Sequence, residues 1–300
     1  MGSLTGRRAL VTGGGTGIGY GCAEQLLRAG AHVTIAGRRG DVLEAAAERL
    51  AAIASGEARE AGGGAGTVVC DVTDEAQVRE AVAVAAGGAN LDVLVANAGS
   101  GFPGAIVQLD ASGWEFSFRL NVVGTALCIK HAAAVMQHHG GGSIVAISST
   151  SGTKVQPWLA SYVVSKAALD MLVRCAAIEL SQHDIRVNSV QPGYVPTEAM
   201  ASAARDGLHD TLVAATPLGR PGTADDVGRI VVFLAGDDAR WITGQVFGVD
   251  GGLNVPVMPS MAPIAARLYG ADNVAAIDLP DFTDVGARRG ASATPTEAPR

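Results

Sequence analysis

The stretch Tyr162-Val163-Val164-Ser165-Lys166 places a tyrosine and a lysine four residues apart. On a helix this interval puts the phenol and the ammonium group on one face. A free phenol has a pKa of about 10, and a neighbouring positive charge lowers that pKa by favouring the phenolate. The pair therefore predicts an acid/base group that works near neutral pH. An ordinary pair on a helix surface is the alternative interpretation.

Two more polar residues are candidates for the same chemistry. Ser149 follows the apolar run 143–147, which is typical of a buried strand, and its hydroxyl could donate a hydrogen bond to an oxygen on which charge develops. Asn121 stands in an otherwise apolar helical stretch from about residue 114 to residue 136, so its amide must find polar partners. Asn121 is either a structural residue or part of a polar network.

A glycine-dense turn lies near the start of the chain, in residues 9–19. An apolar run leads into it, and the apolar periodicity of residues 18–27 predicts a helix after it. Gly13, Gly17 and Gly19 would let the backbone turn with positive φ and come close to a pyrophosphate. The helix N-terminus would offer free N–H groups to phosphate oxygens. A nucleotide site is the preferred interpretation, and a purely structural turn is the alternative.

The next apolar run, residues 31–36, predicts a second strand and ends at Gly37-Arg38-Arg39. In dinucleotide-binding folds, an acidic residue at this strand end binds the 2′-hydroxyl of the adenosine ribose, and a basic residue accepts a 2′-phosphate. The acidic residue is missing here, whereas Arg38 and Arg39 could supply charge-assisted hydrogen bonds to a phosphate. Two solvated surface arginines are the alternative.

Strands and helices alternate along most of the chain. Such alternation predicts a doubly wound parallel sheet with helices on both faces. A flexible turn is expected at the glycines of residues 62–66, and Thr73 or Asp74 is expected to cap the helix that follows. Beyond the runs already described, we expect strands at 67–70, 91–96, 185–190 and 245–250, and helices at 41–54 and 224–234.

Composition excludes several classes of protein. The chain of 300 residues is 48% hydrophobic, carries a net charge of −7 and has no run of Lys or Arg longer than two residues, which speaks against nucleic acid or an anionic membrane as partner. No signal peptide or membrane span is expected, so the sequence predicts a cytoplasmic protein. The four scattered cysteines are expected to be buried thiols, and we assign no metal site.

Taken together, these motifs resemble the short-chain dehydrogenase/reductase family over about residues 4–253. The motifs agree in type, order and spacing, and they are Thr12-Gly13-x-x-x-Gly17-x-Gly19, Asp71, Asn97-Ala98-Gly99, Asn121, Ser149, Tyr162-x-x-x-Lys166 and Pro192-Gly193. The resemblance implies a single domain (residues 1–253) with a Rossmann-type α/β fold, a seven-stranded doubly wound parallel sheet, and a nicotinamide dinucleotide across the strand ends. It also implies a small-molecule substrate and a homotetramer or homodimer.

The resemblance assigns a role to each matching residue. Tyr162 would be the acid/base, Ser149 would bind the substrate oxygen, and Asn121 would hold a water that links Lys166 to solvent. Lys166 would bond the nicotinamide ribose and, together with the positive nicotinamide ring of the oxidised cofactor, would lower the pKa of Tyr162. Asp71 and the Val72 backbone would hold adenine, Asn97 would support the backbone under the cofactor, and Thr197 would face the carboxamide. The full set of residues expected at the cofactor is Gly13, Thr16, Gly17, Ile18, Gly19, Arg38, Arg39, Asp71, Val72, Asn97, Ala98, Gly99, Tyr162, Lys166, Pro192, Gly193, Val195 and Thr197.

The choice of cofactor rests on two positions. Family members that bind NADP often carry a basic residue within the glycine motif, where this chain has Thr16. The arginines after the second strand do match such members. NADP is therefore favoured, with NAD as the alternative.

The substrate is expected to be an apolar carbonyl compound or secondary alcohol. In the family, the segments that border the site are those that here carry Phe102, Trp158, Tyr194, Met200 and Leu208. Packing in the core or a lid is the alternative for each of these side chains. A non-enzymatic NAD(P)-binding sensor on the same fold is the alternative function, and a sugar-nucleotide epimerase or dehydratase, which ordinarily has a larger substrate domain, is a third possibility.

Residues 254–300 form an extension beyond the usual end of the family's chain. Half of the prolines lie here, and the last residues are rich in Ala, Thr, Pro and Gly. One short helix is expected at 264–269. We expect partial order from Val255 to Tyr269 and disorder beyond about Val285.

Overall fold

The computed structural model describes residues 4–53, 64–198, 207–255 and 260–275. Seven parallel strands form one sheet in the order β3-β2-β1-β4-β5-β6-β7. The predicted Rossmann-type fold with a seven-stranded parallel sheet is confirmed. The strands are β1 (Arg8–Thr12), β2 (His32–Gly37), β3 (Gly64–Val69), β4 (Val93–Ala96), β5 (Gly142–Ile147), β6 (Ile185–Pro192) and β7 (Val246–Val249).

The strand order reverses at β1, whose neighbours are β2 on one side and β4 on the other. Thr12 of β1 is in register with Ala36 of β2, and Val11 of β1 is in register with Val95 of β4. In open parallel sheets, ligands bind in the crevice at the carboxyl ends of the strands, beside such a reversal. The glycine turn after β1 therefore opens into this crevice.

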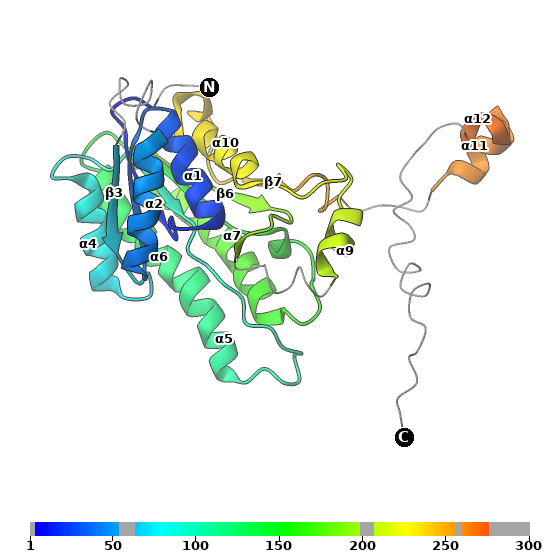
Figure 1. Ribbon diagram of the computed structural model, residues 1–300, viewed down its shortest axis with the longest axis horizontal. Helices are drawn as coiled ribbons and strands as arrows, with labels where there is room; N and C mark the ends of the chain where they lie inside the picture. The colour runs from blue at the N-terminus through cyan, green and yellow to red at the C-terminus, as the bar shows by residue number, and fades with distance from the viewer. Residues whose placement is uncertain (1–3, 54–63, 199–206, 256–259, 276–300) are drawn as a thin grey trace.

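Helices cover both faces of the sheet (Figure 1). Side chains alternate along each strand, so Ala9 and Val11 face one layer and Leu10 faces the other. The first layer consists of α1 (Gly17–Arg28), α2 (Gly40–Ile53) and α10 (Ala224–Ala235), and the second of α4 (Glu75–Ala86), α6 (Gly124–Met136) and α7 (Ala160–Leu180).

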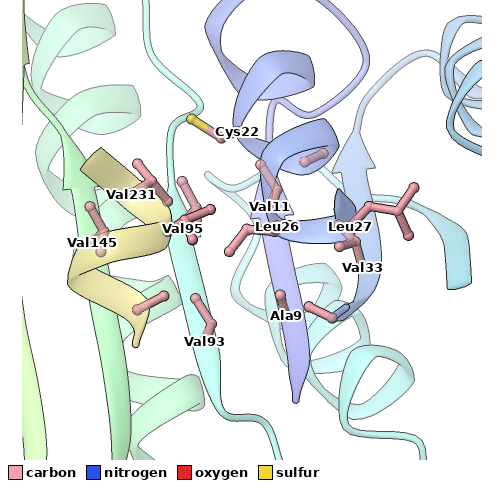
Figure 2. Packing of buried hydrophobic residues seen from close by; sticks show 14 of the residues in the cluster. Ala9, Val11, Cys22, Leu26, Leu27, Val33, Val93, Val95, Val145 and Val231 are labelled. Carbon is pink, nitrogen blue, oxygen red and sulfur yellow. The ribbon is translucent and has the colours of Figure 1, made fainter. Parts of the chain in front are cut away.

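In the first layer, valines from neighbouring strands meet leucines and valines from the helices. Figure 2 shows Val11, Val95 and Val145 of β1, β4 and β5 beneath Leu26 of α1 and Val231 of α10. All five side chains are inaccessible to solvent. With aromatic residues at only 4% of the chain, aliphatic packing of this kind supplies most of the core.

Helices α1 and α10 touch backbone to backbone, although about 200 residues separate them. A Cβ built on Gly21 would lie 2.4 Å from the Cβ of Ala224, and one on Gly228 would lie 2.7 Å from the carbonyl oxygen of Gly21. Only glycine permits so close an approach at these two positions. The helix that starts at the glycine turn is thereby fixed against the last large helix of the domain.

Three expectations from the sequence are wrong in detail. Strand β3 begins at Gly64, inside the stretch expected to be a turn, because parallel pairing with β2 extends to His32 opposite Gly64. The single helix expected at 114–136 is divided into α5 (Ala111–Phe118), a π-helical turn η1 (Arg119–Val123) and α6. Cys22, Cys70 and Cys128 are buried thiols as expected, but Cys175 is exposed on α7.

The helix caps follow the sequence more closely. The Asp74 carboxylate accepts hydrogen bonds from the backbone N–H groups of Ala76 and Gln77 at the start of α4, as expected. Thr223 and Asp226 form a reciprocal capping box at the start of α10, in which each side chain accepts a hydrogen bond from the other residue's backbone.

The chain beyond β7 contains α11 (Ala262–Tyr269) and α12 (Ala271–Ala275), which pack against each other. Helix α11 includes the short helix expected at 264–269. The disorder expected beyond about Val285 lies outside the described residues. The division into a domain of residues 1–253 and an extension of residues 254–300 stays a prediction. Within the described ranges, no helix has the length and hydropathy that crossing a bilayer requires, and no group of His, Cys, Asp or Glu could hold a metal ion.

Candidate active site

The glycine turn between β1 and α1 leaves room for a ligand on backbone atoms. Gly13 and Gly17 have φ of 64° and 55°, in the left-handed region that favours glycine. A Cβ on Gly19 would lie 2.2 Å from the Gly13 carbonyl oxygen, so any other residue would displace the turn. Thr16 precedes α1 with an extended backbone and gives no side-chain cap. The first N–H groups of α1 are therefore open to phosphate oxygens.

Asn97 ties the turn to the end of β4. Its Nδ2 donates hydrogen bonds to the carbonyl oxygens of Thr12 (2.9 Å) and Gly13 (3.2 Å). In return, the Thr12 hydroxyl oxygen accepts hydrogen bonds from the backbone N–H groups of Asn97 (3.0 Å) and Ala98 (3.1 Å). Sequence reasoning used Thr12 only as part of the motif and missed this role, which its position at the buried end of β1 could have suggested.

Charged residues gather where β2 and β3 end. Asp71 Oδ1 accepts hydrogen bonds from the backbone N–H and the hydroxyl of Thr73, which lower the pKa of the carboxyl below its usual value, and Arg38 lowers that pKa further. Arg38 and Arg39 are exposed. Neither guanidinium forms a salt bridge or side-chain hydrogen bond with any residue that the structure describes. Val72, next to Asp71, is buried.

Tyr162 and Lys166 lie one turn apart on α7, beside the end of β5. The Lys166 Nζ lies 5.6 Å from the centre of the Tyr162 ring. This Nζ donates a hydrogen bond to the carbonyl oxygen of Ile147 at 2.8 Å, and the side chain is buried. The Ser149 hydroxyl, two residues beyond Ile147, lies close enough to the Tyr162 side chain to lower the pKa of the phenol. The three side chains expected to do chemistry are therefore neighbours.

Burial sets the pKa values of this pair. It raises the pKa of the Tyr162 phenol, which the neighbouring Ser149 hydroxyl only partly offsets. It also lowers the pKa of Lys166 to about 8, against the opposing effect of the Asp170 carboxylate. In the protein without cofactor, removal of the phenolate from water is the largest effect on the pKa of Tyr162. The lowering expected from Lys166 together with the oxidised nicotinamide ring stays a prediction.

Asn121 lies on the π-helical turn η1, and its side chain is fully buried. Its Oδ1 accepts a hydrogen bond from the Ser100 N–H (3.0 Å), and its Nδ2 donates to the Ser100 carbonyl (2.9 Å) and to Ser165 Oγ (2.9 Å). The extra residue in a π-turn changes the direction in which side chains project, and such turns are frequent at functional sites. Asn121 thus anchors the loop after β4 to α7.

That loop lies directly on the acid/base pair. The position of a Cβ on Gly99 is 2.9 Å from Asn121 Oδ1 and 3.2 Å from Lys166 Nζ. A Cβ on Gly101 would lie 3.1 Å from the Tyr162 ring. Sequence reasoning missed Gly101, although a second glycine just after Asn97-Ala98-Gly99 is a signal for close backbone approach.

The end of β6 forms the wall opposite the glycine turn. Gly193 donates its N–H to the carbonyl of Val249, and a Cβ on it would lie 2.7 Å from the Cα of Asp250. Pro192 and Val195 are buried on either side of it. The Thr197 Cγ2 would lie 2.9 Å from a Cβ on Gly17, so Thr197 sits over the glycine turn.

Aromatic residues border the open side of the site. The loop after Gly101 and the segment before α7 are joined by a hydrogen bond from the Gly104 N–H to the Trp158 carbonyl (2.8 Å). Trp158 is 64% exposed and has φ of 69°, which is rare for a bulky residue and is found where surrounding structure imposes it. Phe102 packs edge-on against Phe116 of α5 at 6.1 Å between ring centres.

Of the other residues expected near the substrate, two can be placed. The Tyr194 hydroxyl hydrogen-bonds to His209 Nδ1 (2.9 Å) on α9 (Leu208–Ala214), and Leu208 starts that helix. Met200 lies outside the described residues. The arrangement as a whole combines a phenol, a hydroxyl beside it, a buried ammonium group and a glycine turn that leads into an uncapped helix N-terminus.

Comparison with known proteins finds a matching family and similar chains. A family model described as enoyl-(acyl carrier protein) reductase matches residues 13–254. The cis-4-hydroxycyclohexanecarboxylate dehydrogenase of Sinomonas cyclohexanicum is 40% identical over 248 residues, which are 82% of this chain and 96% of that protein.

Solved structures have the same fold. A short-chain type dehydrogenase/reductase from Mycobacterium ulcerans is 36% identical, with a TM-score of 0.80 over 92% of this chain and 100% of its own. The Pseudomonas aeruginosa RhlG/NADP active-site complex is 32% identical, with a TM-score of 0.77 over 84% of this chain and 98% of its own.

Proposed function

Because this chain belongs to the short-chain dehydrogenase/reductase family, we propose that it uses NADP to interconvert an apolar secondary alcohol and its carbonyl compound, with Tyr162 as the acid/base. Its class is that of NAD(P)-dependent oxidoreductases that act on CH–OH and C=O groups. The preference for NADP, the role of Tyr162 and the apolar substrate are the proposal. The observation that carries it is the convergence of Ser149, Tyr162 and Lys166 beside the glycine turn.

The residues of this chain fit a nicotinamide dinucleotide. The Cβ-free surface of Gly13, Gly17 and Gly19 and the uncapped start of α1 suit the pyrophosphate. Asp71 and Val72 at the end of β3 would hold the adenine, and Thr197 would hold the carboxamide. When bound, the nicotinamide takes up or supplies the hydride.

The protein's own part of the chemistry is the movement of one proton. In alcohol oxidation, the Tyr162 oxygen takes the hydroxyl proton of the substrate, and in carbonyl reduction it returns that proton. Ser149 donates a hydrogen bond to the same substrate oxygen as its charge changes. The Lys166 ammonium stabilises the phenolate and orients the ribose, while Asn121 holds the loop that packs on Tyr162 and would hold the water that links Lys166 to solvent.

The preference for NADP is supported by charge at the end of β2. Arg38 and Arg39 are exposed there, with no acidic residue to take a ribose 2′-hydroxyl. Because neither guanidinium group is paired with a described residue, each can bind a 2′-phosphate in a bidentate manner. A homologous structure of similar fold was solved with NADP.

An apolar substrate is supported by the aromatic border. Phe102 is 44% exposed and Trp158 is 64% exposed at the open side of the site. Covering exposed aromatic side chains with an apolar molecule removes their surface from water, which is favourable. We therefore expect a substrate with a hydrocarbon body on the carbon that carries the oxygen.

An exposed apolar stripe on α7 supports a homo-oligomer. Val164, Met171 and Ile178 follow one another at seven-residue intervals, which places them on one face, and all three are exposed. Their opposite neighbours on α7 pack into the core. We propose that a second copy of the chain covers this stripe in a homodimer or homotetramer.

The proposal is tested first by thermal unfolding with each nicotinamide cofactor. A ligand at 100 times its Kd adds about 2.7 kcal/mol to the free energy of unfolding, enough to raise the melting temperature visibly. NADPH should stabilise the protein more than NADH at equal concentration, and Arg38→Ala should weaken the effect of NADPH alone. Equal stabilisation by both cofactors would contradict the NADP preference.

The same material then tests the role of Tyr162. Tyr162→Phe should abolish turnover in a panel of secondary alcohols and ketones while keeping its stabilisation by NADPH, and Tyr269→Phe, on α11, should keep both. Substantial turnover by Tyr162→Phe would exclude the phenol as acid/base. Stabilisation by NADPH without turnover in the unmodified protein would favour the non-enzymatic sensor.

A further inference from the structure

Asp170 is a buried carboxylate one helical turn beyond Lys166 on α7, with 5% of its surface exposed. Its Oδ1 accepts a hydrogen bond from Ser189 Oγ at 2.8 Å, and its Oδ2 accepts one from Gln191 Nε2 at 2.7 Å. Both donors belong to β6, two residues apart, and therefore point from the same face of the strand. Both oxygens of the Asp170 carboxyl group therefore act as hydrogen-bond acceptors from the end of β6.

The hydrogen bonds continue from Asp170 to the two ends of the site. Gln191 Oε1 accepts a hydrogen bond from Thr153 Oγ1 at 2.8 Å. Thr153 directly follows the 3-10 turn η2 (Thr150–Gly152), which starts next to Ser149. Gln191 itself is the residue before Pro192-Gly193, where β6 meets the cofactor side of the crevice.

The turn after Ser149 also packs on Asp170 directly. A Cβ on Gly152 would lie 2.5 Å from Asp170 Oδ2 and 3.1 Å from Gln191 Nε2. The absence of a side chain at Gly152 is thus what lets the turn close over the carboxylate. Asn254, in the turn after β7, adds a hydrogen bond from its Nδ2 to Thr153 Oγ1 at 2.9 Å.

The charge on Asp170 acts on Lys166. Among the residues that the structure describes, Asp170 forms no salt bridge, and Lys166 is the cation whose pKa it raises. The other groups around the ammonium are the Tyr162 ring on α7, the Ile147 carbonyl at the end of β5, and Asn121 near Gly99. Apart from the phenol of Tyr162 these groups do not titrate, so Asp170 is the neighbouring carboxylate that opposes the effect of burial on the pKa of Lys166.

We propose that Asp170 is a positioning residue of the active site, which holds the turn after Ser149, the helix of Lys166 and the end of β6 in register and keeps Lys166 in its ammonium form. The inference rests on the proposed function for its catalytic consequence. Its structural and electrostatic parts concern this chain alone. They can be measured without a substrate.

The chain is suited to a direct measurement, because Lys130, Lys154 and Lys166 are its only lysines. Carbon-13 labelling of the lysine Cε position gives three NMR signals, of which those of the exposed Lys130 and Lys154 serve as internal references. In the unmodified protein the Lys166 signal should titrate with a pKa near 8. In Asp170→Asn, which keeps the shape and removes the charge, it should titrate lower by on the order of one pH unit.

A matched variant separates charge from hydrogen bonding. Gln191→Met removes the hydrogen bond that Gln191 donates to Asp170 and the one that it accepts from Thr153, but it keeps the Asp170 carboxylate. The pKa of Lys166 should therefore stay within a few tenths of a unit of its value in the unmodified protein. Its kcat should nevertheless fall by about tenfold with a smaller change in KM, because the turn after Ser149 and the end of β6 are then held less firmly relative to α7. If Asp170→Asn does not fold, Asp170→Ser takes its place as a smaller uncharged variant that can still hydrogen-bond to Ser189.

The activity profile gives a second readout. Carbonyl reduction needs the Lys166 ammonium, so its rate falls as pH rises through the pKa of Lys166. In Asp170→Asn the rate of carbonyl reduction should begin to fall at lower pH. The shift in pH should equal the shift in the pKa of Lys166 that NMR measures. An unchanged Lys166 titration in the uncharged variants would overturn the electrostatic part of the inference, and unchanged kcat in Gln191→Met would overturn the positioning part. Absence of turnover in the unmodified protein would instead count against the proposed function and leave the titration result standing.

Discussion

Asn121→Ala tests whether the π-turn asparagine holds the loop after β4 in place. The change removes the three hydrogen bonds from Asn121 to the Ser100 backbone and to Ser165 Oγ. Each intramolecular hydrogen bond contributes about 0.5–1.5 kcal/mol net to stability. Because Ser100 lies at the surface and its backbone can rebind water, we expect a loss near the lower end of the range for three bonds, about 2 kcal/mol.

The matched control is Ser165→Ala. It removes two hydrogen bonds, the buried one between Ser165 Oγ and Asn121 Nδ2 and the one from Ser165 Oγ to the Tyr162 carbonyl on the same helix, and it leaves the bonds to Ser100 in place. We expect it to cost about 1 kcal/mol. Urea unfolding without cofactor, followed by circular dichroism, measures both differences on one scale.

The comparison also has a kinetic side. Because the loop packs its Gly101 against the Tyr162 ring, Asn121→Ala should lower kcat by about tenfold or more, whereas Ser165→Ala should change it less. The reasoning is refuted if the two variants unfold with the same free energy. In that case the bonds to Ser100 do not anchor the loop, and Asn121 has another role.

Two further predictions concern the surface of α7 and the start of α10. Met171→Glu places a charge in the exposed apolar stripe and should shift the protein to smaller assemblies in sedimentation velocity without lowering the stability of the subunit; an unchanged mass would show that the stripe is not the interface. Asp226→Ala removes the capping box with Thr223 and the ion pair with Arg220, and should cost about 1–2 kcal/mol in urea unfolding at pH 7. The pKa of Asp226 is lowered in the folded protein, first by Arg220, so its contribution is present above about pH 4 and is lost as pH falls further. The difference in free energy of unfolding between the unmodified protein and Asp226→Ala should therefore be smaller at pH 3 than at pH 7. A difference of the same size at both pH values would rule out the Asp226 carboxylate as its source.

The sheet could be predicted because its strands are short apolar runs separated by helices with clear periodicity. The spacing from Tyr162 to Lys166 predicted their common face for the same local reason, since both lie on one helix. The sequence predicted a strand only from residue 67, whereas β3 starts at Gly64. Two of the residues of β3 are glycines, which favour turns in isolation. Pairing with β2 decided the outcome, and pairing is not visible in a local pattern.

The site was harder to predict where it depends on contacts between distant segments. Nothing local marks the π-turn at Asn121, since the apolar stretch around it continues without a break. The sequence also pairs Lys166 with Tyr162, whereas the folded chain gives the ammonium group a backbone acceptor on Ile147 and a carboxylate beneath it on Asp170. These partners come from β5 and from the next turn of α7, and only burial makes their effect on Lys166 large.

The backbone contact between α1 and α10 has a consequence for synthesis of the chain. The glycine turn and α1 lie near the N-terminus, yet the flank of α1 at Gly21 packs against Ala224 and Gly228 of α10. While the ribosome is still adding the middle of the sequence, that flank and the valines beneath it lack their partner helix, and α1 is not yet fixed against α10. Cofactor affinity should therefore emerge late, once residues up to about Ala235 have left the exit tunnel. Under the proposed function, the chain length at which dinucleotide binding first appears would mark the point at which α10 packs against α1.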